Sequence, residues 1–269
     1  MITHSITVLA ILAYLVSAGL ILRGLRQHQK AAPPVALWLW SVAILAHALV
    51  LGQTLVRPDG LDLCLYNALS MVAWLVSLLL WISSLRMPVH ALAVPLLPTT
   101  ALVLALLALL HPSIGKHIII APPGLQLHVV GSLLAYSLLS LATLQALVLA
   151  YQDHQLRGHR VTGWMSLLPP LQPMEHFLFQ LIGAGFLLLS LALVSGFMFL
   201  ENIFAQHLVH KTVLSIAAWF IFGALLLGRW RLGWRGRTAI RWTLVGFSLL
   251  MLAYFGSKLV IEIILAPTT

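Results

Sequence analysis

Residues 176–200 read HFLFQLIGAGFLLLSLALVSGFMFL and contain no Asp, Glu, Lys or Arg. A helix needs about 20 predominantly apolar residues to cross the hydrocarbon core of a bilayer. This stretch exceeds that length, so it predicts a transmembrane helix. Gly183 and Gly185 within it indicate close packing against a neighbouring helix rather than a dinucleotide-binding loop.

Seven further segments of the same kind lie on either side of this stretch. The predicted transmembrane helices cover residues 5–22, 35–55, 63–83, 89–110, 125–150, 176–200, 211–228 and 239–262. The gaps between them are short and hold nearly all the charge. We therefore predict an all-α integral membrane protein with about eight transmembrane helices, formed by a single polytopic domain over residues 1–269.

The fourth predicted helix contains Pro95 and Pro98. A proline inside a helix lacks a backbone donor and disrupts the turn before it. Two alternatives therefore stay open for this segment. It is either a continuous span or a broken, re-entrant segment that changes the count by one.

The composition excludes several classes of protein. Apolar residues make up 61% of the chain and charged residues 8%, against about 45–50% and 25% in soluble domains. Cys64 is the only cysteine, which excludes an intramolecular disulfide and a CxxC motif. The scarcity of carboxylates excludes a calcium cage, and the predicted helices carry no acid at mid-membrane, which counts against a proton-driven transporter.

The distribution of Lys and Arg predicts the orientation. Arg23 and Arg26 follow the first segment and no basic residue precedes it, which favours a helix with its N-terminus outside over a signal peptide. The outer side then holds four of the 15 basic residues, namely Arg57, Lys116, Lys211 and Lys258. The even number of helices returns the C-terminus to the outside. This bias accounts for the net charge of +9 without nucleic-acid binding.

Histidine is unusually frequent, with 12 residues against six acids. His47 alone falls near the centre of a predicted helix, where an unpaired polar group costs several kcal/mol. One interpretation is a metal or haem ligand or a proton relay. The other is a packing histidine that is hydrogen-bonded to a Ser, a Thr or a backbone carbonyl.

Of the six histidines at the predicted outer face, three are candidate ligands. His128 follows Pro122-Pro123-Gly124 and falls in the first turn of the fifth helix, as either a metal ligand or an interfacial residue. His207 and His210 precede the seventh helix with an i, i+3 spacing, which places them on one face if the stretch is helical. They form a basic cluster with Lys211, suited either to weak zinc or copper binding or to a solvated helix start.

Residues 229–237, RWRLGWRGR, alternate basic and aromatic side chains between the last two predicted helices. At a membrane surface this pattern is typical of anchoring to anionic headgroups. Gly233 and Gly236 predict a tight turn of defined shape.

Several features of the chain occur in the order known from one protein family. The C-terminal features are Trp219, Gly233-Trp234-Arg235-Gly236-Arg237, Ala239, Gly246-Phe247 and Phe255-Gly256. The N-terminal and central features are His47, the turn Arg57–Asp62, Tyr66-Asn67-Ala68-Leu69-Ser70, His128-Val129 and Tyr136. Together they resemble the cytochrome c assembly proteins of the CcmC, CcsA and HemX group over most of the chain.

The resemblance implies that the protein binds or handles haem at the outer face of the membrane. By position, His128 resembles the first external histidine of the family, and His47 resembles its first membrane histidine. His207 or His210 would supply a second ligand to the haem iron. The predicted cofactor-binding residues also include Lys211, which would meet a propionate, and Trp219.

The chain also departs from the family pattern. Leu208-Val209-His210-Lys211 stands where the tryptophan-rich WWD motif would have Trp-Asp-Pro-Lys, and residues 201–211 contain no Trp. Leu227 stands where the second membrane histidine would be. The resemblance is therefore to the short HemX-like or YpjD-like branch, and we predict that the chain is not a haem lyase.

Three functions stay open at this point. The first is haem binding or handling in cytochrome c assembly. The second is an accessory or regulatory role without haem, through a cytochrome c assembly partner or another membrane protein. The third is transport of a small solute or a metal. Each predicts a multi-pass protein of the bacterial inner membrane that contacts the lipid bilayer and no nucleic acid.

Overall fold

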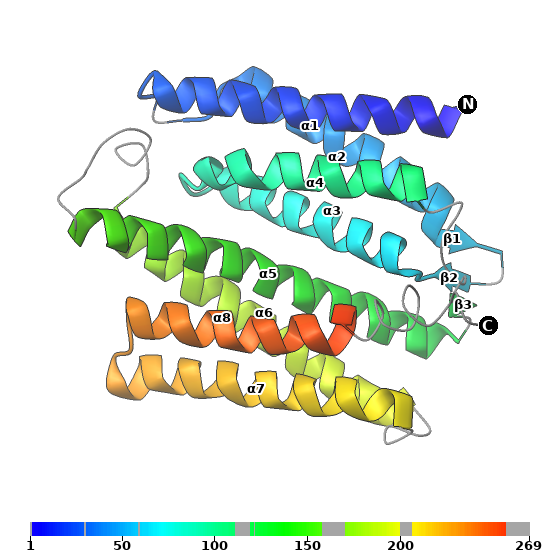
Figure 1. The fold of residues 1–269 in the computed structure, drawn as a ribbon, viewed down its shortest axis with the longest axis vertical. Coiled ribbons are helices and arrows are strands. Elements are labelled where there is room, and N and C mark those ends of the chain that lie inside the picture. The colour runs from blue at the N-terminus through cyan, green and yellow to red at the C-terminus, as the bar shows by residue number, and fades with distance from the viewer. Residues whose placement is uncertain are drawn as a thin grey trace. The chain divides into compact units, whose positions relative to one another are not determined.

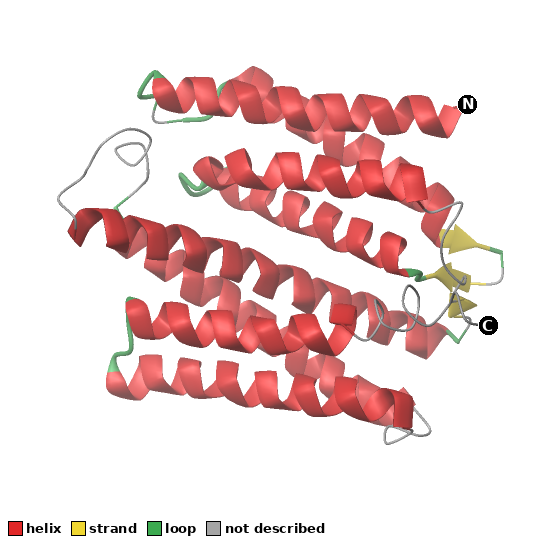
Figure 2. Cartoon of the chain, in the orientation of Figure 1, coloured by secondary structure: helices red, strands yellow, loops and turns green. Residues whose placement is uncertain are grey.

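The structure, a computed structural model, describes residues 2–29, 31–58, 60–110, 119–120, 122–157, 170–199 and 206–256. Helix dominates these residues, as Figure 2 shows. The long helices are α1 (Ile2–Arg26), α2 (Pro34–Leu55), α3 (Leu65–Ser84), α4 (Ala93–Leu110), α5 (Pro123–Arg157), α6 (Leu171–Phe199), α7 (Gln206–Leu232) and α8 (Arg237–Met251). The short elements are β1 (Val56–Arg57), β2 (Gly60–Asp62), β3 (Ile119–Ile120), η1 (His90–Leu92) and η3 (Leu252–Gly256).

Within the described residues, eight helices are long and apolar enough to cross a membrane. This confirms the predicted helical membrane architecture. In hydrocarbon, a helix is stable because it satisfies its own backbone hydrogen bonds. The placement of the two termini outside, and the assignment of all residues to one domain, stay predictions.

Several helices extend beyond the predicted segments. The segment predicted over 125–150 runs from Pro123 to Arg157, and the one predicted over 211–228 runs from Gln206 to Leu232. Hydropathy marks only the part of a helix that lies in hydrocarbon, whereas the backbone hydrogen bonds continue through polar residues at its ends. The stretch that holds His207 and His210 is therefore helical. The last predicted segment is described to Gly256, and the rest of it lies outside the described residues.

The fourth segment forms a continuous α-helix over Ala93–Leu110 with Pro98 inside it, preceded by the turn η1, so its prolines do not break the helix. The hydroxyl of Thr99 donates to the carbonyls of Pro95 and Leu96 at 3.1 and 2.7 Å. Thr100 donates to the same Leu96 carbonyl at 3.0 Å. Side-chain donors of this kind stabilise carbonyls beside a proline turn in a membrane helix.

The chain divides into two compact units, whose helices and strands are labelled in Figure 1. The first contains α1–α4, η1 and the antiparallel pair β1–β2. Its helix α1 packs against both α2 and α4. A buried cluster at this contact consists of Ala10, Ala46, Val50, Leu104 and Leu107. Small alanine side chains allow the backbones of neighbouring helices to approach closely.

The second unit contains α5 up to Asp153, α6–α8, β3 and η3. Glycines allow its helices to approach, because a Cβ at Gly185 would lie 2.7 Å from Leu139 Cδ2. A Cβ at Gly246 would lie 2.9 Å from Phe222 Cζ. The packing role that the sequence predicts for the Gly183–Gly185 stretch is thus seen at Gly185.

Candidate functional site

His128 lies in the second turn of α5, which begins at Pro123. Its Nδ1 lies 2.9 Å from Ser195 Oγ on α6, and the side chain is half-buried. A Cβ at Gly196, the next residue of α6, would lie 3.1 Å from the His128 Cε1. The imidazole is therefore packed on the backbone of α6, where Ser195 Oγ bonds its Nδ1 and the backbone of Ala192 also interacts with the ring.

This arrangement fits a ligand to haem iron. Metal-binding histidines are oriented by a second group that engages the ring nitrogen facing away from the metal. Ser195 engages Nδ1, so Nε2 is the nitrogen that would bind iron. Partial burial keeps the imidazole within reach of a ligand without leaving it in bulk water.

His47 lies in the first unit and is fully buried on α2. Its Nδ1 lies 3.3 Å from the Tyr14 hydroxyl on α1, and its Nε2 lies 2.8 Å from Ser70 Oγ on α3. Because both nitrogens have partners, iron binding would require one of these hydrogen bonds to break. The arrangement favours the packing interpretation, and the ligand role of His47 stays a prediction.

The contacts of His47 continue into a longer chain of polar groups. Tyr14 also forms a hydrogen bond with Ser77 on α3. The indole nitrogen of Trp40 on α2 donates to the same Ser77 hydroxyl at 2.8 Å. All of these side chains are fully buried, so the chain links α1, α2 and α3 inside the first unit.

The other predicted cofactor-binding residues lie on α7. Trp219 donates its indole N–H to Ser190 Oγ at 2.8 Å and stacks on Phe186 with ring centroids 5.4 Å apart. His210 is exposed and Lys211 is half-buried. The side chain of His207 and residues 200–205 of the preceding loop lie outside the described part of the chain. The cofactor roles of these residues stay predictions.

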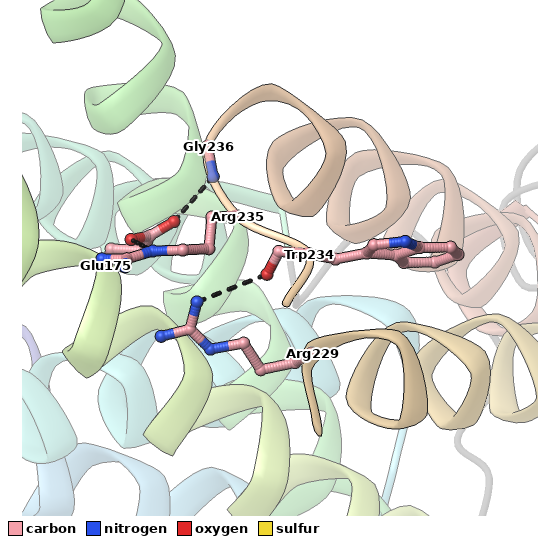
Figure 3. A network of polar contacts seen from close by, with 5 residues as sticks. All are labelled: Glu175, Arg229, Trp234, Arg235 and Gly236. Atoms are coloured by element: carbon pink, nitrogen blue, oxygen red, sulfur yellow. Dashed lines mark hydrogen bonds and ion pairs between the residues drawn. The ribbon is translucent and has the colours of Figure 1, made fainter. Parts of the chain in front are cut away.

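The turn between α7 and α8 is closed by a buried carboxylate (Figure 3). Glu175 of α6 accepts a hydrogen bond from the Arg235 Nε at 2.9 Å and one from the Gly236 backbone N–H at 2.6 Å. Arg229 donates to the Trp234 carbonyl at 3.4 Å. The φ angles of Gly233 and Gly236 are +66° and +54°. The predicted tight turn at these glycines is therefore confirmed.

A second ion pair joins this turn to α5. Arg237 Nε lies 2.8 Å from Asp153 Oδ2. We call the set Asp153, Glu175, Arg235, Gly236 and Arg237 the arginine clamp. The sequence interpretation assigned the arginines of this turn to lipid headgroups, but two of them pair with carboxylates of the same unit.

Sequence reasoning missed the partners of the candidate residues. It did not single out Ser195, Gly196 or Tyr14, and it named Ser70 only as part of the stretch Tyr66–Ser70, not as a partner of His47. The available signal was a Ser-Gly pair inside an otherwise apolar segment, because such a pair usually has a packing or hydrogen-bonding reason. Glu175 and Asp153 carried a second signal, since acids beside membrane helices pair with cations.

Comparisons with known proteins give a consistent result. A family model described as "Cytochrome C assembly protein" matches residues 63–265. Inner membrane protein YpjD of Escherichia coli (strain K12) is 35% identical over 259 residues, which cover 95% of this chain and 97% of that protein. The cytochrome c biogenesis protein CcsA of Gloeobacter violaceus is 29% identical over 87 residues, 32% of this chain and 26% of that protein. No solved structure matches the chain.

Proposed function

Because the chain belongs to the cytochrome c assembly protein family and is a multi-pass inner-membrane protein, we propose that it binds haem at the outer face of that membrane, with His128 as an iron ligand. The observation that carries this proposal is the half-buried imidazole that Ser195 fixes through Nδ1. An imidazole held in this way is suited to bind iron through Nε2.

The residues of α7 would complete the site. Lys211 is half-buried in the first turns of this helix, where its ammonium group would bind a haem propionate by a charge-assisted hydrogen bond. His207 or His210 would supply the second iron ligand. Trp219 and Phe186 form a stacked aromatic surface that suits a porphyrin face.

The haem itself supplies the redox and ligand chemistry of its iron. The part of this chain is to hold the group and set its orientation. A holding function also agrees with the absence of the tryptophan-rich motif from residues 201–211. We therefore place the protein among haem-binding or haem-handling members of the family rather than among haem lyases.

An optical spectrum of the full chain tests this proposal. The protein is purified in mild detergent from haem-replete membranes, and its spectrum is recorded oxidised and then reduced with dithionite. We expect a Soret band with sharp α and β bands of two nitrogen ligands, which His128→Ala abolishes. His154→Ala, an exposed histidine at the other end of α5, is the matched control and retains the spectrum. Absence of a Soret band after haemin addition would overturn the proposal.

A second candidate function is an accessory role that keeps this fold without haem and acts through a protein partner. The observation that favours it is His47, whose ring nitrogens are both engaged within the protein. A variant with His128, His207 and His210 all replaced by Ala distinguishes the two functions. If it restores the phenotype of a deletion strain as well as the wild type does, the accessory function is supported and haem binding is not required.

A further inference from the structure

We infer that Ser195 and Gly196 are positioning residues for His128: Ser195 sets which ring nitrogen carries the proton, and Gly196 sets where the ring lies. The inference rests on the proposed function only in taking haem iron as the group that Nε2 would meet. Its contacts, all within the second unit, can be tested without haem.

The hydrogen of the Ser195 hydroxyl determines the direction of the contact with His128. Ser195 Oγ lies 3.0 Å from the carbonyl oxygen of Ala192 and donates to it. A hydroxyl has one hydrogen and two lone pairs. With its hydrogen on this carbonyl, Ser195 Oγ is left to accept in the 2.9 Å contact to His128 Nδ1, and we assign the ring nitrogen as the donor.

The position of the imidazole proton decides which ring nitrogen of His128 can bind a metal. A neutral imidazole carries one N–H, and the hydrogen bond made by one nitrogen decides the state of the other. Because Nδ1 of His128 is the donor, Nε2 carries the lone pair. A free neutral histidine prefers the opposite tautomer, with the proton on Nε2. Ser195 thus reverses the intrinsic preference and leaves Nε2 ready to bind a metal.

Gly196 affects the position of the His128 ring. At Gly196 an added Cβ would lie 3.1 Å from Cε1 and 3.8 Å from each ring nitrogen of His128. The shortest of these distances is less than an ordinary van der Waals contact. Glycine in a helix interior costs about 1 kcal/mol relative to alanine, so its presence here has a packing reason. The absent side chain leaves room for the imidazole on the α6 backbone.

The two residues have separable effects. Removing the Ser195 hydroxyl removes the acceptor that keeps the proton on Nδ1. Adding a methyl group at Gly196 shifts the ring but keeps this hydroxyl in place. Loss of the group that orients a metal-binding histidine typically lowers metal affinity about 10- to 100-fold. We expect a loss of haemin affinity in this range for Ser195→Ala and for Gly196→Ala. Only Ser195→Ala should also change the protonated nitrogen.

The decisive measurement is nitrogen NMR of the full, haem-free chain with ¹⁵N-labelled histidine. The His128 signals are assigned by their loss in His128→Ala. The wild type should show a protonated Nδ1 and a lone pair on Nε2, and Ser195→Ala should move the proton towards Nε2. Ser140→Ala is the matched control, because among the described residues its hydroxyl bonds only the Tyr136 carbonyl of its own helix. Ser195→Thr keeps a hydroxyl and should keep the wild-type tautomer, which separates this effect from misfolding.

The outcomes separate the inference from the proposed function. A wild-type His128 with its proton on Nε2, or the same tautomer in the wild type and Ser195→Ala, would overturn the inference. Haemin titrations followed at the Soret band then test the proposed function. If the wild type binds no haemin, the proposed function fails, while the NMR result still decides the role of Ser195.

Discussion

At the scale of single residues, the chain of hydrogen bonds around His47 has a fixed direction. The Trp40 indole N–H can only donate, so Ser77 accepts from it and its own hydroxyl hydrogen is left for Tyr14. In the arrangement that satisfies every member, Tyr14 donates to His47 Nδ1 and His47 Nε2–H donates to Ser70. A buried polar network that satisfies its members in this way specifies one packing of the surrounding helices.

We predict that Tyr14→Phe lowers the free energy of unfolding by about 1–3 kcal/mol, because His47 Nδ1 would lose its donor in a dry environment. Ser70→Ala should cost a similar amount. The double variant should cost less than the sum of the two, since both partners act through one ring. Unfolding in mixed detergent, followed by circular dichroism, measures these differences.

Ser41→Ala is the control for this prediction, because in the part of the chain that the structure describes the Ser41 hydroxyl bonds only the Leu37 carbonyl of its own helix. Its effect should stay within about 0.5 kcal/mol. Equal effects of Ser41→Ala and Tyr14→Phe would contradict a structural role for the chain around His47.

The sequence predicts that such residues need hydrogen-bond partners, but it does not predict which residues these partners are. A histidine at the centre of an apolar helix must find a partner, and that much follows from His47 alone. Tyr14 lies 33 positions away on another helix, and Ser195 lies 67 positions from His128. Which helix faces which is decided by three-dimensional packing, so these pairings could not be read from spacing.

At the scale of elements, the arginine clamp joins the ends of four helices. Glu175 at the start of α6 binds the α7–α8 turn, and Asp153 near the end of α5 binds the first residue of α8. Periodicity and glycine placement predict the turn itself. Whether the arginines of this turn pair with carboxylates or with lipid headgroups depends on where α5 ends and where α6 begins. Both helices extend beyond the segments that hydropathy predicts at these ends.

Glu175→Gln tests the charge of this clamp. The amide retains an acceptor for the Gly236 N–H but loses the ion pair with Arg235. We expect a loss of about 1 kcal/mol in unfolding free energy, because Arg235 is 53% exposed and exposed pairs contribute little. Glu175→Ala, which also removes the acceptor, should cost about 1–3 kcal/mol. Thermal unfolding of both variants in one detergent gives the comparison, and an equal loss would show that the charge alone matters.

Gly236→Ala tests the backbone of the same turn. At a φ of +54° and a ψ of −125°, a conformation that glycine adopts far more readily than other residues, a Cβ would strain the backbone by about 1–3 kcal/mol. Gly19→Ala is the matched control, since Gly19 lies inside α1 with nothing within 4 Å of its added Cβ. Alanine there should stabilise the helix by up to about 1 kcal/mol. The opposite signs make the comparison independent of overall expression, and a stabilising Gly236→Ala would contradict the assigned strain.

At the scale of the whole molecule, hydropathy alone predicts the helical architecture. Each transmembrane helix is a local feature of about 20 residues, so all eight segments could be found without knowledge of their neighbours. The division into two compact units could not be predicted in this way, because it depends on which helices pack together.

The predicted orientation can be tested with single cysteines in a Cys64→Ala background. Val56→Cys, exposed in β1, should react with a membrane-impermeant thiol reagent from the periplasmic side. Gln27→Cys at the end of α1 and Leu232→Cys at the end of α7 should react only after the inner membrane is opened. The charge bias requires this pattern. The reverse pattern would place both termini inside.

The arginine clamp also has a consequence for biosynthesis. Arg235 follows Glu175 by 60 positions, and Arg237 follows Asp153 by 84. Since the ribosome releases the N-terminal part first, α5 and α6 are made before the arginines that pair with Asp153 and Glu175 in the folded unit. A chain arrested before Arg235 therefore has both of these helices but neither of the two ion pairs that fix the final hairpin to them.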